Sequence, residues 1–313
     1  MNIIPKKHAQ AVERQGSTQV RVERGVEMKI GRKNTTALFL AGAVFLWLGS
    51  VWKNGDERCV CDAETAQNTP YGWDKTSSYT TYYNAKDEGR CENITIAAEL
   101  IDGATVQPYG EFSFNKTVGR RTAEAGFRQA KIIVNGEYVL GVGGGVCQVS
   151  TTLYNAALKS GLEVLEYHPH SLQIPYVAPS RDAMVSSECD LQLYNAHAYP
   201  VCLTAEVFSG GLRVSVYGRN EGDRYEMISR TIEEIPPPAP IVKMGEKEEI
   251  IRSPKNGVRS ELYLERYRGN VLLSRKRIRV DEYRPTQGII AKKVVETTNK
   301  MVFNACLFQE KLL

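Results

Sequence analysis

The longest apolar run in the chain covers residues 36–52 and contains no charged side chain. A buried helix of a soluble domain normally keeps a polar face, and this run has none, which favours a membrane-spanning helix near the short limit of length. Eight lysines and arginines precede it within residues 1–33, and Trp47 and Trp52 lie at its far end. We therefore predict a cytoplasmic basic tail over 1–35, a single anchor over 36–52 and a main domain outside the cytoplasm. A cleaved signal peptide is the alternative, although the basic region is long and no clear A-x-A site follows.

After the anchor, the hydrophobic pattern indicates short helices and strands. Residues 53–92 are polar without sustained periodicity and predict a stalk. Over 93–100, apolar positions recur three and four apart, as in a helix. Residues 131–134 and 137–142 flank Asn135-Gly136, which is a strong hairpin signal. A second helix is predicted over 148–160, where an apolar stripe that includes Leu153 ends before Gly161.

Strand-like segments then dominate the chain, at 162–167, 183–187, 188–195, 201–208 and 212–217. We predict that 188–195 and 201–208 form a hairpin and that a domain over 93–219 ends there. Residues 220–240 predict a Pro-rich connector, and 241–313 predict a small β-rich appendage with a hairpin at Arg268-Gly269-Asn270 and a helix in the last dozen residues. The expected fold class is α+β, with mostly antiparallel strands and a few packed helices behind a single transmembrane helix.

Composition excludes some functions without choosing one. The net charge of +4 is small and evenly spread, which argues against a nucleic-acid partner. Seven cysteines are an odd number, and an exported chain can form disulfides. We predict no bridge between Cys189 and Cys202, because the expected hairpin separates them by about 13 Å along the strand, and a disulfide needs Cα atoms within about 7 Å.

The clearest chemical signal is the segment 141–148, Gly-Val-Gly-Gly-Gly-Val-Cys-Gln. Its glycines allow positive φ and a close approach of the backbone, and they place Cys147 at a helix start. Free N–H groups and the helix dipole there lower the pKa of a thiol, and the same amides, or the side chain of Gln148, can stabilise an oxyanion. Cys147 is therefore predicted as a nucleophile. The alternative is that the glycines serve close packing and Cys147 is a small buried hydrophobe. The spacing fits neither a P-loop nor G-x-G-x-x-G.

A cysteine nucleophile needs a base, and the chain has four histidines. His8 falls in the predicted cytoplasmic tail and His197 in a predicted turn, which leaves His168 and His170. Pro169 lies between these two and favours an extended, outward-facing conformation. We predict His170 as the base.

Two nearby residues are predicted to orient that imidazole, Asp182 and Ser171. Asp182 has an alternative role as a turn cap paired with a neighbouring arginine. The histidine pair also has an alternative role, because H-x-H together with Cys147 suits zinc, although no second ligand pair accompanies it.

Two long stretches make the chain similar to a known family. Residues 141–185 contain GGGVCQVSTTLYNAAL, HPHS and PSRDAMV, and residues 108–127 read PYGEFSFNKTVGRRTAEAGF. Together they resemble the VanW family over about residues 93–218. The resemblance implies an exported domain of the bacterial cell envelope, named from glycopeptide-resistance clusters, and it supplies no settled activity. The chain departs from the family pattern at Tyr167, Met184 and Glu188-Cys189.

Two kinds of function fit these residues. The first is a cysteine-dependent acyl-transfer or hydrolytic enzyme on peptidoglycan peptides, with Cys147, His170, Asp182 and Gln148 as catalytic residues. The second is a non-catalytic module that binds the cell wall through the anion site at the helix start. Ligand contacts are predicted at Gly143, Gly144, Gly145, His168, Ser171 and Arg181. We expect no cofactor and no metal; the expected partners are peptidoglycan, or its peptide stems, and the membrane.

Overall fold

The computed structural model of the protein describes residues 73–134 and 136–293. The predicted basic tail, the transmembrane helix at 36–52, the first half of the stalk and the terminal helix lie outside these ranges. Within them, no helix combines the length and apolar character that crossing a bilayer requires.

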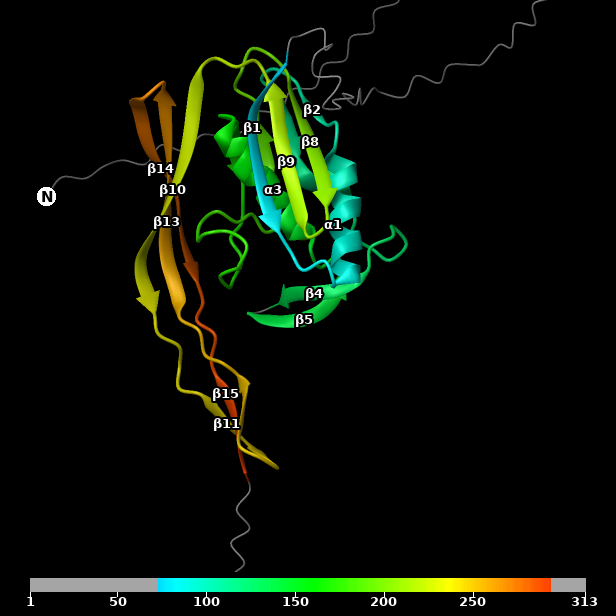
Figure 1. Ribbon diagram of the computed structural model, residues 1–313, viewed down its shortest axis with the longest axis vertical. Coiled ribbons are helices and arrows are strands. Elements are labelled where there is room, and N and C mark those ends of the chain that lie inside the picture. Colours follow the sequence, from blue (N-terminus) through cyan, green and yellow to red (C-terminus); the bar gives the residue numbers. More distant parts are fainter. Residues whose placement is uncertain (1–72, 135, 294–313) are drawn as a thin grey trace, which may run out of the picture. The chain divides into compact units, whose positions relative to one another are not determined.

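The described residues form three helices and fifteen strands (Figure 1). The helices are α1 (Glu88–Ile101), α2 (Phe114–Val118) and α3 (Val146–Lys159). The strands are β1 (Asp74–Tyr82), β2 (Thr105–Val106), β3 (Glu111–Ser113), β4 (Gln129–Val134), β5 (Glu137–Val142), β6 (Glu163–Glu166), β7 (Gln192–Tyr194), β8 (Val201–Phe208), β9 (Gly211–Gly218), β10 (Asp223–Ile235), β11 (Ile241–Gly245), β12 (Glu249–Arg252), β13 (Gly257–Arg268), β14 (Val271–Tyr283) and β15 (Ile289–Lys293). Nearly all strand pairs are antiparallel, and β11 with β15 is parallel. The predicted α+β class is confirmed for this part of the chain.

Helix α3 contributes much of the main hydrophobic core. It packs on β1 and β9 of the antiparallel sheet β1-β9-β8-β2, and α1 packs on β8 of the same sheet and on α3 (Figure 1). The second predicted helix is confirmed, with a start two residues earlier than expected. Twelve of its fourteen residues are buried, including the polar Ser150, Thr151 and Asn155. A helix buried on all sides needs a second covering layer, and here the segment around Ala183 supplies it.

That covering segment explains why no strand forms at 183–187. Ser150 Oγ donates to the carbonyl of Ala183 at 2.6 Å, and the Ala183 amide donates to Thr151 Oγ1 at 3.0 Å. Asn155 Nδ2 donates to the carbonyl of Arg181 at 2.7 Å. Because these backbone groups bond to helix side chains, they are not available for a strand ladder.

The predicted hairpin between 188–195 and 201–208 is wrong. Within the first segment only β7 is a strand, and it pairs with β3 and β6, whereas β8 pairs with β9 and β2. The Asn195 side chain donates to the carbonyls of Val106, Gln107 and Tyr199, which diverts the chain after β7. Cys189 forms no bridge with Cys202, but the hairpin argument behind that prediction does not hold.

The hairpins predicted from turn signals are confirmed. Strand β4 pairs with β5, with Val134 opposite Glu137. Strand β13 pairs with β14, with Arg268 opposite Val271. In both cases the local turn sequence and the flanking apolar residues were sufficient to predict the pairing.

Two predicted boundaries need correction. The last part of the expected stalk, 74–82, is strand β1, paired along its length with β9, and the first predicted helix begins at Glu88. The expected connector 220–240 consists mainly of β10, which ends directly before Pro236, where the chain loses its N–H donors. Strands β10, β13 and β14 form one sheet whose Leu262 belongs to the main hydrophobic core. Strands β13 and β14 of the expected appendage therefore share the core of the preceding domain.

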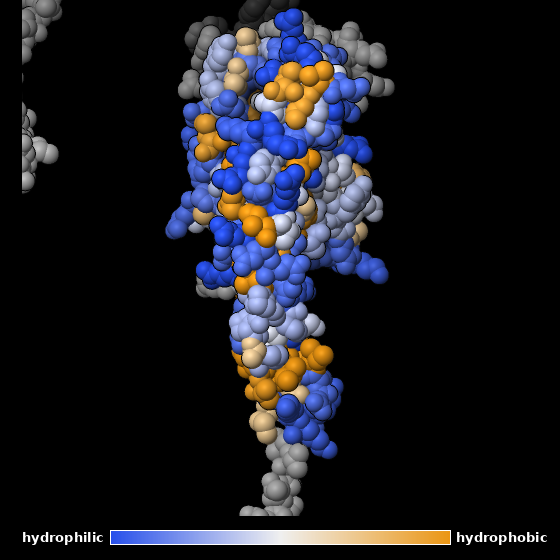
Figure 2. All heavy atoms as spheres, turned by 90° about the vertical axis from the view of Figure 1, so that its left-hand side faces the viewer, coloured by the Kyte–Doolittle hydropathy of each residue, from blue (hydrophilic) through white to orange (hydrophobic). Residues whose placement is uncertain are grey.

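The smaller sheet β11-β15-β12 differs from that core sheet in its exposed apolar side chains. Met244 and Ile250 are each 69% exposed, and Val242 is 52% exposed. Figure 2 shows hydrophobic surface gathered towards the lower end of the view.

Candidate functional site

The glycine-rich turn before α3 is a close-packed junction between β5 and the helix. Gly143 and Gly145 have φ of 85° and 113°, and a Cβ on Gly144 would lie 2.7 Å from the carbonyl oxygen of Lys131. Asn93 fixes the turn, because its Nδ2 donates to the carbonyls of Gly144 and Arg128, each at 2.9 Å. Side chains at these glycines would be strained or would clash, so the turn determines where Cys147 stands.

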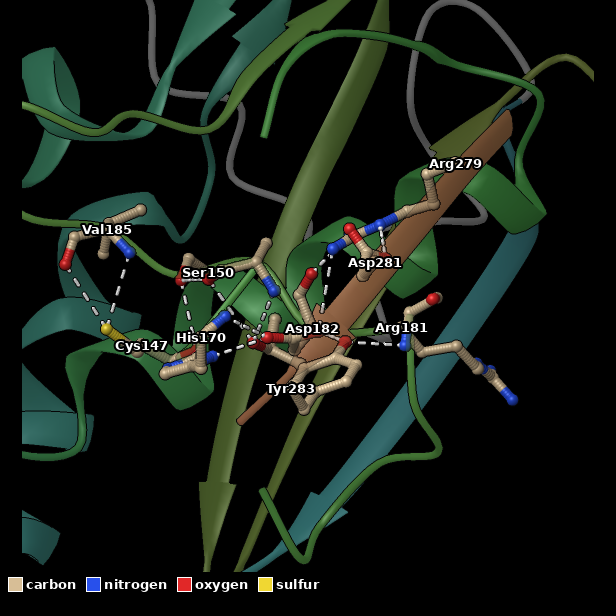
Figure 3. A network of polar contacts seen from close by, with 12 residues as sticks. Cys147, Ser150, His170, Arg181, Asp182, Val185, Arg279, Asp281 and Tyr283 are labelled. Atoms are coloured by element: carbon tan, nitrogen blue, oxygen red, sulfur yellow. Dashed lines mark hydrogen bonds and ion pairs between the residues drawn. The ribbon is translucent and has the colours of Figure 1, made fainter. Parts of the chain in front are cut away.

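Cys147 lies in the first turn of α3 and is partly exposed. The amide of Val185 donates to its Sγ at 3.5 Å, and as a thiol its Sγ can donate to the Val185 carbonyl at 3.4 Å (Figure 3). Val185 belongs to the segment that covers α3, so the fold brings the nucleophile candidate and the covering segment together.

The imidazole of His170 stands beside this thiol and is buried, with 7% exposure. Its Nδ1 bonds to Asp182 Oδ2 at 2.7 Å, and its backbone N–H donates to the same oxygen at 2.7 Å (Figure 3). Because Nδ1 is occupied by the carboxylate, Nε2 is the nitrogen left to interact with Cys147. The outward-facing conformation predicted from Pro169 is therefore wrong for His170, which turns inward because Asp182 holds both its ring and its backbone.

Asp182 is held in turn by strand β14. The Tyr283 hydroxyl donates to its Oδ1 at 2.5 Å and accepts from the Ser180 amide at 2.7 Å. Arg279 Nη1 donates to the Asp182 carbonyl at 2.7 Å, and Nη2 lies 3.7 Å from Oδ1 (Figure 3). Cys147, His170 and Asp182 thus form an array of thiol, imidazole and orienting carboxylate.

The electrostatics of this array favour a charged pair. Burial acts to raise the pKa of Cys147, but a hydrogen bond with His170, the charge of that imidazole, the Val185 amide and the charge of Arg121 outweigh it, so the pKa lies below its ordinary value. Burial acts to lower the pKa of His170, but hydrogen bonds with Asp182 and Cys147 and their charges raise it from 6.5 to about 9. Both shifts favour a thiolate beside an imidazolium.

The carboxylate is correspondingly stabilised as an anion. Burial acts to raise the pKa of Asp182, but the hydrogen bond and charge of His170, the charge of Arg279 and the hydrogen bond from Tyr283 hold it below its ordinary value. A buried carboxylate that remains ionised is the state needed to orient an imidazolium.

The array opens into a cavity of about 1320 Å³. Cys147, His170 and the glycine-rich turn line it together with the β4–β5 hairpin and the segments 119–122 and 184–187. A volume of this order accommodates a peptide-sized ligand beside the thiol.

The Gln148 side chain does not face the thiol as an oxyanion donor would. It is fully buried; its Nε2 donates to Thr81 Oγ1 and to the Tyr82 carbonyl, and its Oε1 accepts from Arg90. Both amide hydrogens are occupied, so the predicted oxyanion role of this side chain is wrong, and Gln148 anchors α3 to β1 and α1.

The other predicted ligand contacts are spread out. His168 bonds to Glu166 at 2.9 Å, Arg181 Nε donates to Asn155, and neither residue lines the cavity. Ser171 borders a second cavity, of about 350 Å³, and its carbonyl accepts from the Arg284 amide. Within the described ranges, no group of three or more His, Cys, Asp or Glu residues is placed to hold a metal ion.

Sequence reasoning missed Tyr283, Arg279 and Arg121. The first two come from β14, about one hundred residues beyond Asp182, and no local pattern connects them to it. Arg121 lies in the 108–127 stretch that carried the family resemblance, but a single arginine after a turn has no distinguishing spacing.

Residues 89–217 match the family model described as "VanW like protein". This part of the chain, which carries the cysteine–histidine–aspartate array, is similar to the VanW-like family.

Two relatives support the assignment. The chain is 41% identical over 140 residues to the "Uncharacterized protein YoaR" of Bacillus subtilis, covering 44% of this chain and 46% of that protein. It is 26% identical over 83 residues to the "Vancomycin B-type resistance protein VanW" of Enterococcus faecalis, covering 26% of this chain and 30% of that protein. The chain thus spans less than half the length of these curated relatives. The crystal structure of HP0197-G5 aligns at 12% identity over 22% of this chain and 97% of that chain, with a TM-score of 0.13 that is too low to indicate a shared fold.

Proposed function

We propose that the protein is a membrane-anchored, extracytoplasmic enzyme that uses Cys147 to transfer or hydrolyse acyl groups of peptidoglycan peptides. The observation that carries the proposal is the Cys147–His170–Asp182 array at the start of α3, at the wall of a peptide-sized cavity. A thiolate, a proton donor and a buried orienting carboxylate are the groups that acyl transfer requires.

In the first half of the reaction, the Cys147 thiolate attacks the carbonyl carbon of an amide bond. The carbonyl π bond opens to an oxyanion, and the His170 imidazolium then gives its Nε2 proton to the leaving nitrogen as the C–N bond breaks. The products are a thioester on Cys147, a free amine and a neutral imidazole.

In the second half, an incoming water or amine attacks the thioester. Neutral His170 takes its proton, the C–S bond breaks, and the thiolate and imidazolium are restored. Water as the acceptor gives hydrolysis, and an amine of another peptide gives transfer.

Backbone amides are the groups available for the oxyanion. The Gln148 amide donates to the Gly145 carbonyl at 2.8 Å, whereas the Cys147 amide lies in the first helical turn, where no intrahelical carbonyl precedes it. The Cys147 N–H and the dipole of α3 therefore support the developing negative charge.

The cell-envelope setting is supported by two independent features. One relative is named for vancomycin resistance, and the uncharged run 36–52 follows a basic segment, as in a helix that places the following chain outside the cytoplasm. Protease added to intact protoplasts should therefore remove the region after Lys53 and spare an N-terminal tag. Protection of the main domain would contradict the proposed location.

The proposed chemistry is tested with Cys147→Ser and His170→Ala, scored for the turnover of defined muropeptides by mass spectrometry. Each variant should lose activity and retain its fold. The double variant should be no less active than the less active of the two single variants. Cys189→Ser is the matched control, because it alters a free cysteine of the same domain that does not line the cavity. Iodoacetamide should alkylate Cys147 far faster than Cys189.

The result against the enzyme would be well-folded Cys147→Ser and His170→Ala proteins that process every muropeptide that wild type processes. If wild type binds muropeptides and processes none, the non-catalytic binding module replaces the enzyme.

A further inference from the structure

Arg121 is held rigidly on the cavity wall. It follows α2 and Gly119, and its Nη1 donates to Asn115 Oδ1 at 2.8 Å and to the Gly119 carbonyl at 3.1 Å. Asn115 is itself fixed, because its Nδ2 donates to the carbonyls of Ser186 and Cys189, each at 3.0 Å. The guanidinium is therefore oriented before a ligand arrives.

This arginine also stands next to the turn that delivers the nucleophile. Its Cβ lies 3.1 Å from the position that a Cβ on Gly143 would take, and Arg121, Gly143 and Cys147 line the same cavity. The charge of Arg121 contributes to the lowered pKa of the Cys147 thiol, in agreement with their proximity.

In the described part of the chain, no carboxylate forms an ion pair with Arg121, although the charge of Asp190 acts on it. Nη1 carries both of its hydrogen bonds, so Nε and Nη2 are left. In the described ranges, Arg279 Nη2 is the one buried side-chain polar atom that lacks a hydrogen-bond partner. Nε and Nη2 of Arg121 also lack a partner, so they are not sealed in the interior. They form the side of the guanidinium that binds a carboxylate with two parallel hydrogen bonds.

The charge around the cavity favours an anion. Arg90, Arg120, Arg121 and Lys131 line it, against the single carboxylate of Asp87. That carboxylate is already engaged with the first turn of α1, where it accepts from the Arg90 amide. A partly enclosed site with this balance concentrates negatively charged ligands.

We propose that Nε and Nη2 of Arg121 bind a carboxylate of the substrate close to the carbonyl that Cys147 attacks. The inference rests on the proposed cysteine enzyme and specifies its substrate class as peptides with a free carboxylate near the reacting bond. Two kinds of peptide carry such a group: those that end there, and those with an acidic side chain.

Two alkylating reagents of similar size test the site without turnover, because iodoacetate carries a carboxylate where iodoacetamide carries a neutral amide. The measured quantity is the iodoacetate-to-iodoacetamide rate ratio at Cys147, referred to the same ratio at Cys189. Arg121→Gln should lower it about tenfold, the effect of losing a charged hydrogen-bonding partner. Any change in the thiol pKa affects both reagents alike and cancels in the ratio.

Arg120→Gln is the matched control, because it removes the same charge one residue away, from a more exposed side chain on the same cavity. It should lower the ratio by about twofold at most, since exposed charges are screened. Arg121→Lys should restore part of the preference. An unchanged ratio in Arg121→Gln, or an equal loss in Arg120→Gln, overturns the carboxylate site. Because alkylation needs no turnover, this outcome is separate from a failure of the proposed enzyme.

Muropeptides that wild type processes then distinguish the two carboxylate sources. Each is compared with forms amidated at the chain end or at the acidic side chain. The amidation that raises KM in wild type and leaves KM unchanged in Arg121→Gln identifies the bound group. If neither amidation changes KM in wild type, the proposal is wrong.

Discussion

Asp182→Asn tests the electrostatic basis of the site more directly than any change to the nucleophile. The substitution preserves the size of the side chain and the backbone contact with Arg279, and it removes the charge that faces His170. The rise in the His170 pKa from 6.5 to about 9 corresponds to about 3 kcal/mol in favour of the imidazolium. The bond to Asp182 is the first of the causes that raise it, so most of this preference should disappear.

The expected result is a lower pKa of His170 and a higher pKa of Cys147. Without the carboxylate, burial opposes the imidazolium with less compensation, and the thiolate loses its charged partner. Where the thiol is mainly protonated, each unit by which its pKa rises should reduce Cys147 alkylation by about tenfold. Iodoacetamide rates across pH, read by mass spectrometry, give the pKa of the thiol, and the ring resonances of His170 in NMR give that of the imidazole.

Glu166→Gln is the matched control, since it makes the same chemical change beside His168, whose bond to Glu166 is half-exposed. It should leave the pKa values of both Cys147 and His170 unchanged. If Asp182→Asn remains folded by its thermal melt and alkylates with the wild-type pH profile, the inferred role of the carboxylate is refuted.

Three further outcomes are expected. Leu153→Ala, at a fully buried position of α3, should reduce stability by about 2–5 kcal/mol in thermal melts, whereas Leu165→Ala, at a position 50% exposed, should change it by about 0.5 kcal/mol or less. The pKa of Asp182 is lower in the folded than in the unfolded chain, so its stabilisation is present above about pH 4 and is lost as the pH falls through the folded value. The free energy of unfolding of Asp182→Asn should therefore fall less steeply at acid pH than that of wild type. Identical pH profiles of stability would contradict this. Tyr283→Phe should lower the free energy of unfolding by about 1–3 kcal/mol and move acid unfolding to higher pH, because it removes a hydrogen bond to the carboxylate and leaves the Ser180 amide unpaired. An unchanged thermal melt would show that neither bond contributes to stability.

The parts of the fold that could be predicted from the sequence depend on local signals. The hairpins at 131–142 and 261–281 follow from their turn residues, and the placement of Cys147 at the start of α3 follows from the glycines before it. These features involve neighbours along the chain, so their physical causes are visible in a window of a few residues.

Predictions that depended on distant partners were less successful. The segment 183–187 has the composition of a strand, but Ser150 and Thr151 take up its backbone groups. The segment 74–82 lacks an apolar pattern, and it becomes a strand because it pairs with β9, more than one hundred residues away. Propensity cannot anticipate either result, since both are decided by tertiary contacts.

The candidate site shows the same division. Cys147, the proposed nucleophile, is placed by local geometry, on a helix that is buried nearly all round. The base and its carboxylate lie on an irregular segment that α3 holds on one side, through Thr151, and β14 holds on the other, through Tyr283. The alignment of His170 with Cys147 therefore depends on the sheet β10-β13-β14, although neither Tyr283 nor Arg279 lines the main cavity. Loss of packing in that sheet should appear first as a change in the titration of the pair, because the carboxylate loses its orientation before the helix that carries the thiol is disturbed.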